Sequence, residues 1–76
     1  MVRAKMVCVT KIARAGSHGG GEIDLEPVIS GSEENASFYQ WTPAGKVTLN
    51  VTSKKVFNSF EVDKEYYIDF TEATAK

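Results

Sequence analysis

The sequence predicts an α+β or mostly β fold: a small, strongly bent antiparallel sheet or partly closed barrel of about four main strands, with one short helix between strands 2 and 3. Three observations lead to this fold class. Apolar and polar residues alternate along 2–12 and 23–29, a helix-start pattern follows at 32–34, and two further alternating runs occupy 46–52 and 65–71. A chain of 76 residues is too short to bury two separate cores, so residues 1–76 should form a single domain.

The first segment, residues 2–14, is predicted to be one long strand. Its even positions should face the core, since a strand directs alternate side chains to the same face: Val2, Ala4, Met6, Cys8, Thr10 and Ile12. Val7 and Val9 on the odd face indicate that part of the other side is covered too. Partial cover on both faces is typical of a coiled or barrel sheet.

The second strand is expected over 22–29, after a glycine-rich connection at 16–21. Its apolar set is Ile23, Leu25, Pro27 and Ile29. Proline cannot donate a ladder hydrogen bond, so Pro27 predicts an edge strand or a bulge. In a hairpin, basic side chains of the first strand would oppose acidic ones of the second, namely Lys5 and Lys11 against Glu22, Asp24 and Glu26. Cross-strand pairing is favoured over a basic binding stripe.

A short helix is predicted over 33–40, with Ser32 as its N-cap and Glu33 and Glu34 in its first turn. Phe38 and Trp41 lie three residues apart, so one helical face should place both aromatic rings on the sheet. The TPAG sequence at 42–45 then turns the chain back.

The last third of the chain predicts two more strands. The first covers 46–52. The sequence of 53–59 is compatible with two structures, one helical turn capped by Ser53 or an irregular connection. A turn at 63–64 precedes the final strand over 65–71, in which Tyr66, Ile68 and Phe70 should share the inward face.

Composition limits the chemistry that the chain can carry. One cysteine and one histidine exclude an intrachain disulfide and a zinc site within one chain, and we expect no cofactor. No stretch approaches the roughly 18 consecutive apolar residues of a membrane span. Basic residues interrupt the N-terminal apolar positions, so we expect no signal peptide and no membrane association.

The residues that could support catalysis are predicted to lie apart. Cys8 should point into the core, whereas the single histidine, His18, belongs to the glycine-rich connection. That connection lacks the Lys-Ser/Thr ending of a phosphate-binding loop, and the acidic residues look solvated rather than held in an apolar pocket. We therefore predict a protein that is not an enzyme and has no catalytic or metal-binding residue.

Three strings follow the basic first strand in a fixed order: SGSEEN at 30–35, TPAG at 42–45 and KEYYIDFT at 64–71. In this arrangement the chain resembles a group of small uncharacterised proteins of tailed bacteriophages and prophages. In that group a Pro-Gly turn typically introduces the last strand, where this chain has Val62-Asp63. The resemblance brings no activity with it. It implies a protein that acts in the cytoplasm of a bacterial host or in a phage virion.

The function predicted from these features is that of a non-catalytic, phage-encoded interaction protein, either a virion-associated accessory module or one that binds a host factor. Its expected partner is a protein, including a second copy of itself. The candidate protein-contact residues are Glu22, Asp24, Glu26, Glu33 and Glu34. The alternative is an OB-like protein that binds single-stranded nucleic acid in a basic groove with aromatic stacking platforms. Its candidate residues are Arg3, Lys5, Lys11, Arg14, Tyr39, Trp41 and Tyr67.

Overall fold

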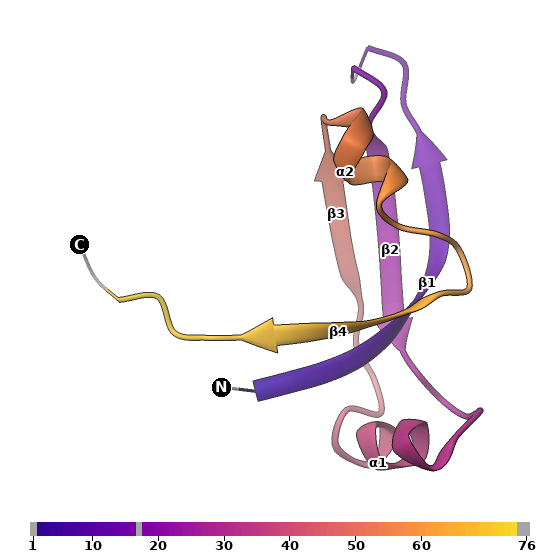
Figure 1. The fold of residues 1–76 in the computed structure, drawn as a ribbon, viewed down its shortest axis with the longest axis vertical. Coiled ribbons are helices and arrows are strands. Elements are labelled where there is room, and N and C mark those ends of the chain that lie inside the picture. The colour runs from indigo at the N-terminus through magenta and orange to yellow at the C-terminus, as the bar shows by residue number, and fades with distance from the viewer. Residues whose placement is uncertain (1, 17, 75–76) are drawn as a thin grey trace.

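The computed structural model describes residues 2–16 and 18–74 and contains a four-stranded antiparallel sheet with two short helices (Figure 1). The elements in chain order are β1 (Val2–Ala13), β2 (Gly21–Pro27), α1 (Glu33–Trp41), β3 (Val47–Val51), α2 (Lys54–Asn58) and β4 (Glu65–Phe70). The strand order in the sheet is β3-β2-β1-β4. The predicted fold class is confirmed, including the helix between the second and third strands.

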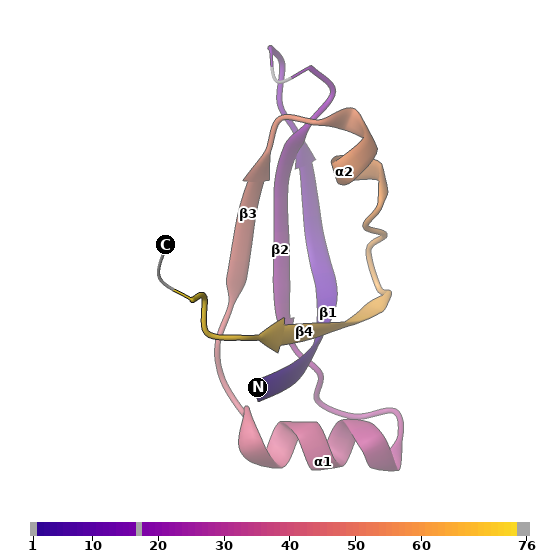
Figure 2. The same cartoon turned by 60° about the vertical axis from the view of Figure 1, so that its left-hand side comes forward.

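The long strand β1 bends the sheet into a curled half-barrel because its two halves pair with different neighbours. Residues 6–13 pair with β2, and residues 2–7 pair with β4. Figures 1 and 2 show β4 and the start of β1 crossing the other strands at a steep angle. The inner, concave face holds the buried apolar residues Ala4, Met6, Cys8, Ile23 and Leu25. Half-buried side chains from β3, α2 and β4 pack against this core.

A β-bulge in β1 changes which side chains face inward. Cys8 pairs with Leu25 and Thr10 pairs with Asp24, so the register shifts between them. Beyond the shift, Lys11 lies opposite the buried Ile23, whereas Ile12 lies opposite Glu22 and is 43% exposed. The prediction that Thr10 and Ile12 face the core is therefore wrong, because one extra residue reverses the strand's alternation.

The second strand is an internal strand rather than an edge strand, since β2 pairs with β1 on one side and β3 on the other. Pro27 is the last residue of β2. The residue after it, Val28, donates its backbone N–H to Lys5 O at 3.2 Å. Because the strand ends at this point, Val28 is buried and Ile29 is exposed, opposite to the predicted alternation.

Both helices begin where the capping residues predict. Ser32 accepts a hydrogen bond from Asn35 N–H at the start of α1, and Ser53 accepts one from Val56 N–H at the start of α2. Phe38 packs on Tyr67 of β4, with ring centres 6.0 Å apart. Trp41, the last residue of α1, is 77% exposed, so the prediction that it packs on the sheet is wrong. Figure 2 shows α1 and α2 at opposite ends of the sheet.

The turn before β4 relies on Asp63, which adopts a positive φ of 76°. Asp63 N–H donates to Cys8 O at 2.8 Å, and Cys8 N–H donates to Lys64 O at 2.9 Å. These two bonds attach the turn to the middle of β1. In β4, Tyr66 and Ile68 pack against the core as predicted, but Phe70 is largely exposed.

Candidate interaction site

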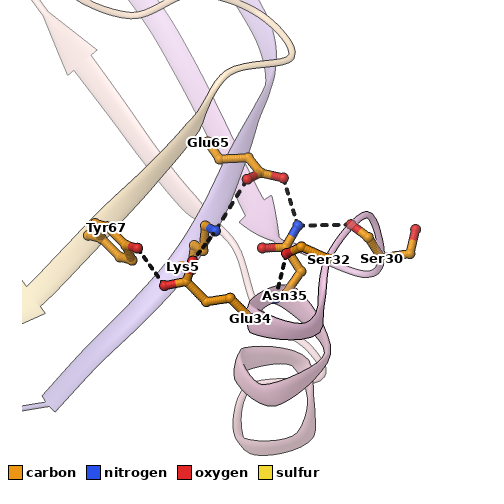
Figure 3. A network of polar contacts seen from close by, with 7 residues as sticks. All are labelled: Lys5, Ser30, Ser32, Glu34, Asn35, Glu65 and Tyr67. Atoms are coloured by element: carbon orange, nitrogen blue, oxygen red, sulfur yellow. Dashed lines mark hydrogen bonds and ion pairs between the residues drawn. The ribbon is translucent and has the colours of Figure 1, made fainter.

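Five polar side chains join α1 to the outer face of the sheet, and we call them the docking cluster: Lys5, Glu34, Asn35, Glu65 and Tyr67 (Figure 3). Lys5 Nζ lies 3.0 Å from Glu34 Oε1 and 3.4 Å from Glu65 Oε1. The Tyr67 hydroxyl donates to Glu34 Oε2. Because these residues come from β1, β4 and α1, the cluster holds the helix against both strands of the bent end of the sheet.

Asn35 occupies the centre of this contact and is only 1% exposed. Its side-chain Nδ2 donates to Ser30 O and to Glu65 Oε2, both at 2.8 Å. Its Oδ1 is buried and has no hydrogen-bond partner within residues 2–16 and 18–74. Since a buried polar group is stabilising only when it is hydrogen-bonded, Asn35 holds the loop before α1 chiefly through its amide nitrogen.

The cluster shifts the pKa values of its members in opposite directions. The hydrogen bond from Tyr67, followed by the one from Lys5, lowers the pKa of Glu34. The hydrogen bond that Tyr67 donates to Glu34 raises the pKa of Tyr67. The Lys5 ammonium, which lies beside Glu34, also has a raised pKa. At neutral pH the cluster therefore holds an ionised Glu34 and a protonated Tyr67.

Arg3 extends the cluster toward the end of β4. Its Nε lies 2.6 Å from Asp69 Oδ1 and its Nη2 3.0 Å from Oδ2, in a bidentate contact that lowers the pKa of Asp69. The guanidinium carbon also lies 4.9 Å from the centre of the Tyr67 ring. Arg3, Lys5 and Tyr67, three of the candidates for nucleic-acid binding, are thus brought together, with carboxylates beside both cations.

The remaining candidates for nucleic-acid binding lie elsewhere. Lys11 is on the inner face, where its Nζ donates to Phe60 O at 2.7 Å and lies 4.3 Å from the centre of the Phe57 ring. Arg14 lies beyond the far end of β1 and forms an ion pair with Glu22 at 2.7 Å. Exposed aromatic rings of α1 come from Tyr39 and Trp41. The four basic residues therefore do not line one groove.

The candidate protein-contact residues also differ in their surroundings. Asp24 is buried and accepts a hydrogen bond from Thr48 Oγ1 at 2.9 Å, so it does not lie on a contact surface. Glu34 belongs to the docking cluster, and Glu22 pairs with Arg14. The other two candidates, Glu26 and Glu33, are exposed.

The cysteine and the histidine occupy different environments. Cys8 is fully buried on the inner face, and its Sγ lies 3.9 Å from Thr10 O. Burial raises the pKa of the Cys8 thiol. His18 is exposed in the connection between β1 and β2, where its backbone φ is 53°. Within residues 2–16 and 18–74, no three His, Cys, Asp or Glu side chains form a group that could hold a metal ion.

The chain exposes more surface than a compact domain of its size. Its accessible area is 5526 Å², whereas a folded monomer of this mass exposes about 4,600 Å². Its radius of gyration is 13.9 Å, against about 11 Å for a compact chain of this length. Part of the excess belongs to the extended residues 71–74, and part to the projecting ends of β1 and β4 (Figure 1).

No family model, curated protein or solved structure matches the chain. None of the helices in the described part of the chain is long and apolar enough to cross a membrane. The candidate site therefore rests on the geometry of the molecule itself: an open half-barrel with exposed apolar side chains around its rim.

Three apolar side chains of the sheet are exposed, although the alternation predicts that they face inward. Val2 and Phe70 face each other across the β1–β4 ladder and are 66% and 55% exposed, although both were expected in the core. Leu49 of β3 lies beside the fully buried Ile23 and is nevertheless 38% exposed. The alternation places all three on the inner face, but it carries no information on where that face ends.

Proposed function

We propose that this chain is a non-catalytic binding module of a tailed bacteriophage or prophage, and that it works by binding a protein partner in the virion or in the host. The observation that carries the proposal is the excess of exposed surface, about 900 Å² above that of a compact monomer of this mass. One side of a standard protein interface buries about 800 Å². The excess is thus of the size that one partner covers, although part of it belongs to the extended residues 71–74.

The chemistry of the exposed side chains supports the same proposal. Val2 and Phe70 lie next to one another at the projecting end of the sheet, and Trp41 ends α1. Large aromatic side chains are enriched at the centres of protein interfaces, where they contribute most of the binding free energy. Covering them with a partner would extend the small core of the isolated chain.

The phage origin rests on the three strings SGSEEN, TPAG and KEYYIDFT. In the structure the first string forms the capped start of α1, and the third includes two residues of the docking cluster, Glu65 and Tyr67. The resemblance therefore covers the segments that hold α1 on the sheet. A group of phage proteins that shares these strings would share this arrangement.

Mass spectrometry of purified virions tests the virion version of the proposal. We expect the chain at a constant ratio to the major structural proteins across independent preparations. Its absence from virions of a phage that expresses it would contradict this version. The host-factor version predicts instead that one host protein is recovered with the tagged chain, and that recovery is lost in Phe70→Asp but kept in Lys55→Glu, an exposed position of α2.

A second candidate function, binding of single-stranded nucleic acid, is favoured by one observation. Trp41 and Tyr39 present exposed rings at the end of α1, and such rings stack on bases. The test is an oligonucleotide titration at low salt, followed by Trp41 fluorescence and by gel shift. Unchanged fluorescence and mobility at micromolar protein would contradict this function, and a loss of binding in Trp41→Ala would support it.

A further inference from the structure

The strand β3 forms an edge of the sheet that carries no charged residue. It pairs with β2 on one side only, and in Figures 1 and 2 no other strand lies beside it on the side away from β2. An antiparallel edge strand directs every second backbone N–H and C=O away from its neighbour. Natural proteins usually protect such an edge with charges, proline or a bulge, and the sequence VTLNV contains none of these.

The same five residues are symmetric about Leu49 in their pattern of apolar and polar side chains. Antiparallel pairing of two β3 strands centred on Leu49 would place Val47 opposite Val51 of the other copy and Leu49 opposite itself. Thr48 would then lie opposite Asn50, so apolar side chains meet on the inner face and polar ones on the outer face. No like charges would face each other within the paired strands.

We propose that two copies of this chain associate through antiparallel pairing of their β3 strands, with a two-fold axis at Leu49. The half-barrels would then join into one eight-stranded sheet, since each copy contributes four strands. This type of interface is self-complementary, as a closed two-fold dimer requires. The inference goes beyond the proposed function, because self-association at β3 does not depend on a phage or host partner.

Apolar side chains that a single chain leaves exposed on its inner face favour a second copy. Leu49, at the centre of β3, is 38% exposed. Val2 and Phe70, which pair at the end of the β1–β4 ladder, also have side chains on the inner face and remain largely exposed. The excess surface of about 900 Å² per chain, which includes the extended residues 71–74, is of the same order as the roughly 800 Å² per partner of a standard interface. A second copy would therefore cover surface that the partner proposed above would otherwise cover.

The other free edge of the sheet, that of β4, is less suited to self-pairing. It carries Glu65 and Asp69, both of which already contact cations of β1. Pairing of two β4 strands centred on Tyr67 would place Glu65 of one copy opposite Asp69 of the other. Like charges directly opposite one another destabilise an antiparallel pair, so β3 is the favoured edge.

Sedimentation velocity or light scattering over a range of protein concentrations tests the proposal, with Leu49→Lys and its control Ile29→Lys. Both substitutions replace an exposed aliphatic residue by lysine, but only Leu49 lies on β3. We expect a concentration-dependent dimer for the wild type and Ile29→Lys, and an association at least tenfold weaker for Leu49→Lys. A wild type that stays monomeric to millimolar concentration, or an undiminished dimer of a folded Leu49→Lys, would overturn the proposal.

Disulfide crosslinking decides the question if Leu49→Lys does not fold. Directly opposite Cβ atoms of an antiparallel pair lie about 5 Å apart, within reach of a disulfide after a small shift. Leu49→Cys should form a covalent dimer under mild oxidation, whereas Ile29→Cys and the wild type, whose Cys8 is buried, should not. Equal crosslinking of Leu49→Cys and Ile29→Cys would contradict the assigned edge. A monomeric chain found in virions would refute the dimer while leaving the proposed function intact.

Discussion

The Tyr67 hydroxyl donates a hydrogen bond to Glu34, so a partly exposed aromatic side chain of β4 holds the first turn of α1. The same ring packs against Phe38 one turn later in the helix. Together with Lys5 and Asn35, this contact fixes α1 on the outer face of the bent sheet. The arrangement makes the position of α1 sensitive to the ionisation of two groups.

We expect Glu34→Gln to lower the pKa of Tyr67 toward its ordinary value, because the ionised carboxylate is the main cause of the raised pKa. An ultraviolet absorbance titration of the folded protein measures this change. Tyr67→Phe identifies the Tyr67 transition, since Tyr39 and Tyr66 remain. An identical tyrosine titration in the wild type and Glu34→Gln would contradict the assigned contact.

The same pair predicts how stability depends on pH. The pKa of Glu34 is lowered in the folded chain, so its contribution is fully present above its unfolded pKa of about 4.3 and is lost as the pH falls through the lowered value. The pKa of Tyr67 is raised, so its contribution is present below about pH 10 and is lost as the pH rises through the raised value. Urea unfolding at several pH values should show both losses, each weakened in Glu34→Gln.

Asn35→Ala is expected to lower the free energy of unfolding by about 1–3 kcal/mol. The substitution removes the Nδ2 bonds to Ser30 O and Glu65 Oε2 and leaves those acceptors without this donor. Urea unfolding followed by circular dichroism measures the loss. Asn58→Ala is the matched control, because Asn58 is exposed at the end of α2, and it should change stability by less than about 0.5 kcal/mol. Equal losses in the two variants would show that Asn35 does not anchor the helix.

Cys8 should react slowly with thiol reagents in the folded protein and rapidly in denaturant. Its side chain is fully buried and its pKa is raised, so little thiolate is available to react. The rate of reaction with an aromatic disulfide reagent, measured by absorbance, tests this expectation. A single-cysteine variant with Cys8→Ser and Ser37→Cys places the thiol on an exposed position of α1 and should react at the rate of a free thiol. Rapid, stoichiometric modification of native Cys8 would contradict its burial.

Asp63→Gly is expected to raise the free energy of unfolding by about 0.5–1 kcal/mol. Asp63 has a φ of 76°, a conformation that glycine adopts without the steric cost that a side chain adds. Thermal or urea unfolding measures the gain. Asp63→Ala keeps a Cβ without the polar side chain and should be less stable than the wild type. A loss of stability in Asp63→Gly would mean that the aspartate side chain stabilises the turn.

Much of the fold was predictable because local sequence and structure agree. Ser32 and Ser53 mark the helix starts, and each alternating run forms a strand whose ends lie within two residues of the predicted ends, with the largest difference at the end of β2. The direction of individual side chains was less predictable, and β1 shows why. The pattern Cys8, Thr10, Ile12 continues the apolar alternation without interruption, so nothing in it marks the bulge at Val9.

The candidate site was predictable only in part, for a related reason. Arg3, Lys5 and Tyr67 belong to the predicted basic and aromatic set, and the structure brings them together beside Asp69 and Glu34. Which carboxylates would lie beside them depends on β1 pairing with β4, a contact between opposite ends of the chain. Neither composition nor spacing predicts such a pairing. The free edge at β3 is equally unpredictable, because it follows from the strand order.

Two substitutions in β1 test the bulge directly. Lys11→Ala is expected to lower the free energy of unfolding by about 1–2 kcal/mol, since it removes the bond from Nζ to Phe60 O and the cover of the Phe57 ring. Ile12→Thr keeps a β-branched side chain at a position that is 43% exposed, so it should cost less than about 1 kcal/mol.

An uninterrupted strand would give the opposite order. Without the bulge, Ile12 would lie on the inner face with Cys8, and truncating it would remove buried apolar contacts, whereas Lys11 would lie in solvent and its loss would be nearly neutral. Urea unfolding of the wild type and the two variants distinguishes these cases. If the bulge is present, Lys11→Ala loses more unfolding free energy than Ile12→Thr. A greater loss in Ile12→Thr than in Lys11→Ala would show that β1 keeps a single alternation, and that the shift between Cys8 and Thr10 does not exist in solution.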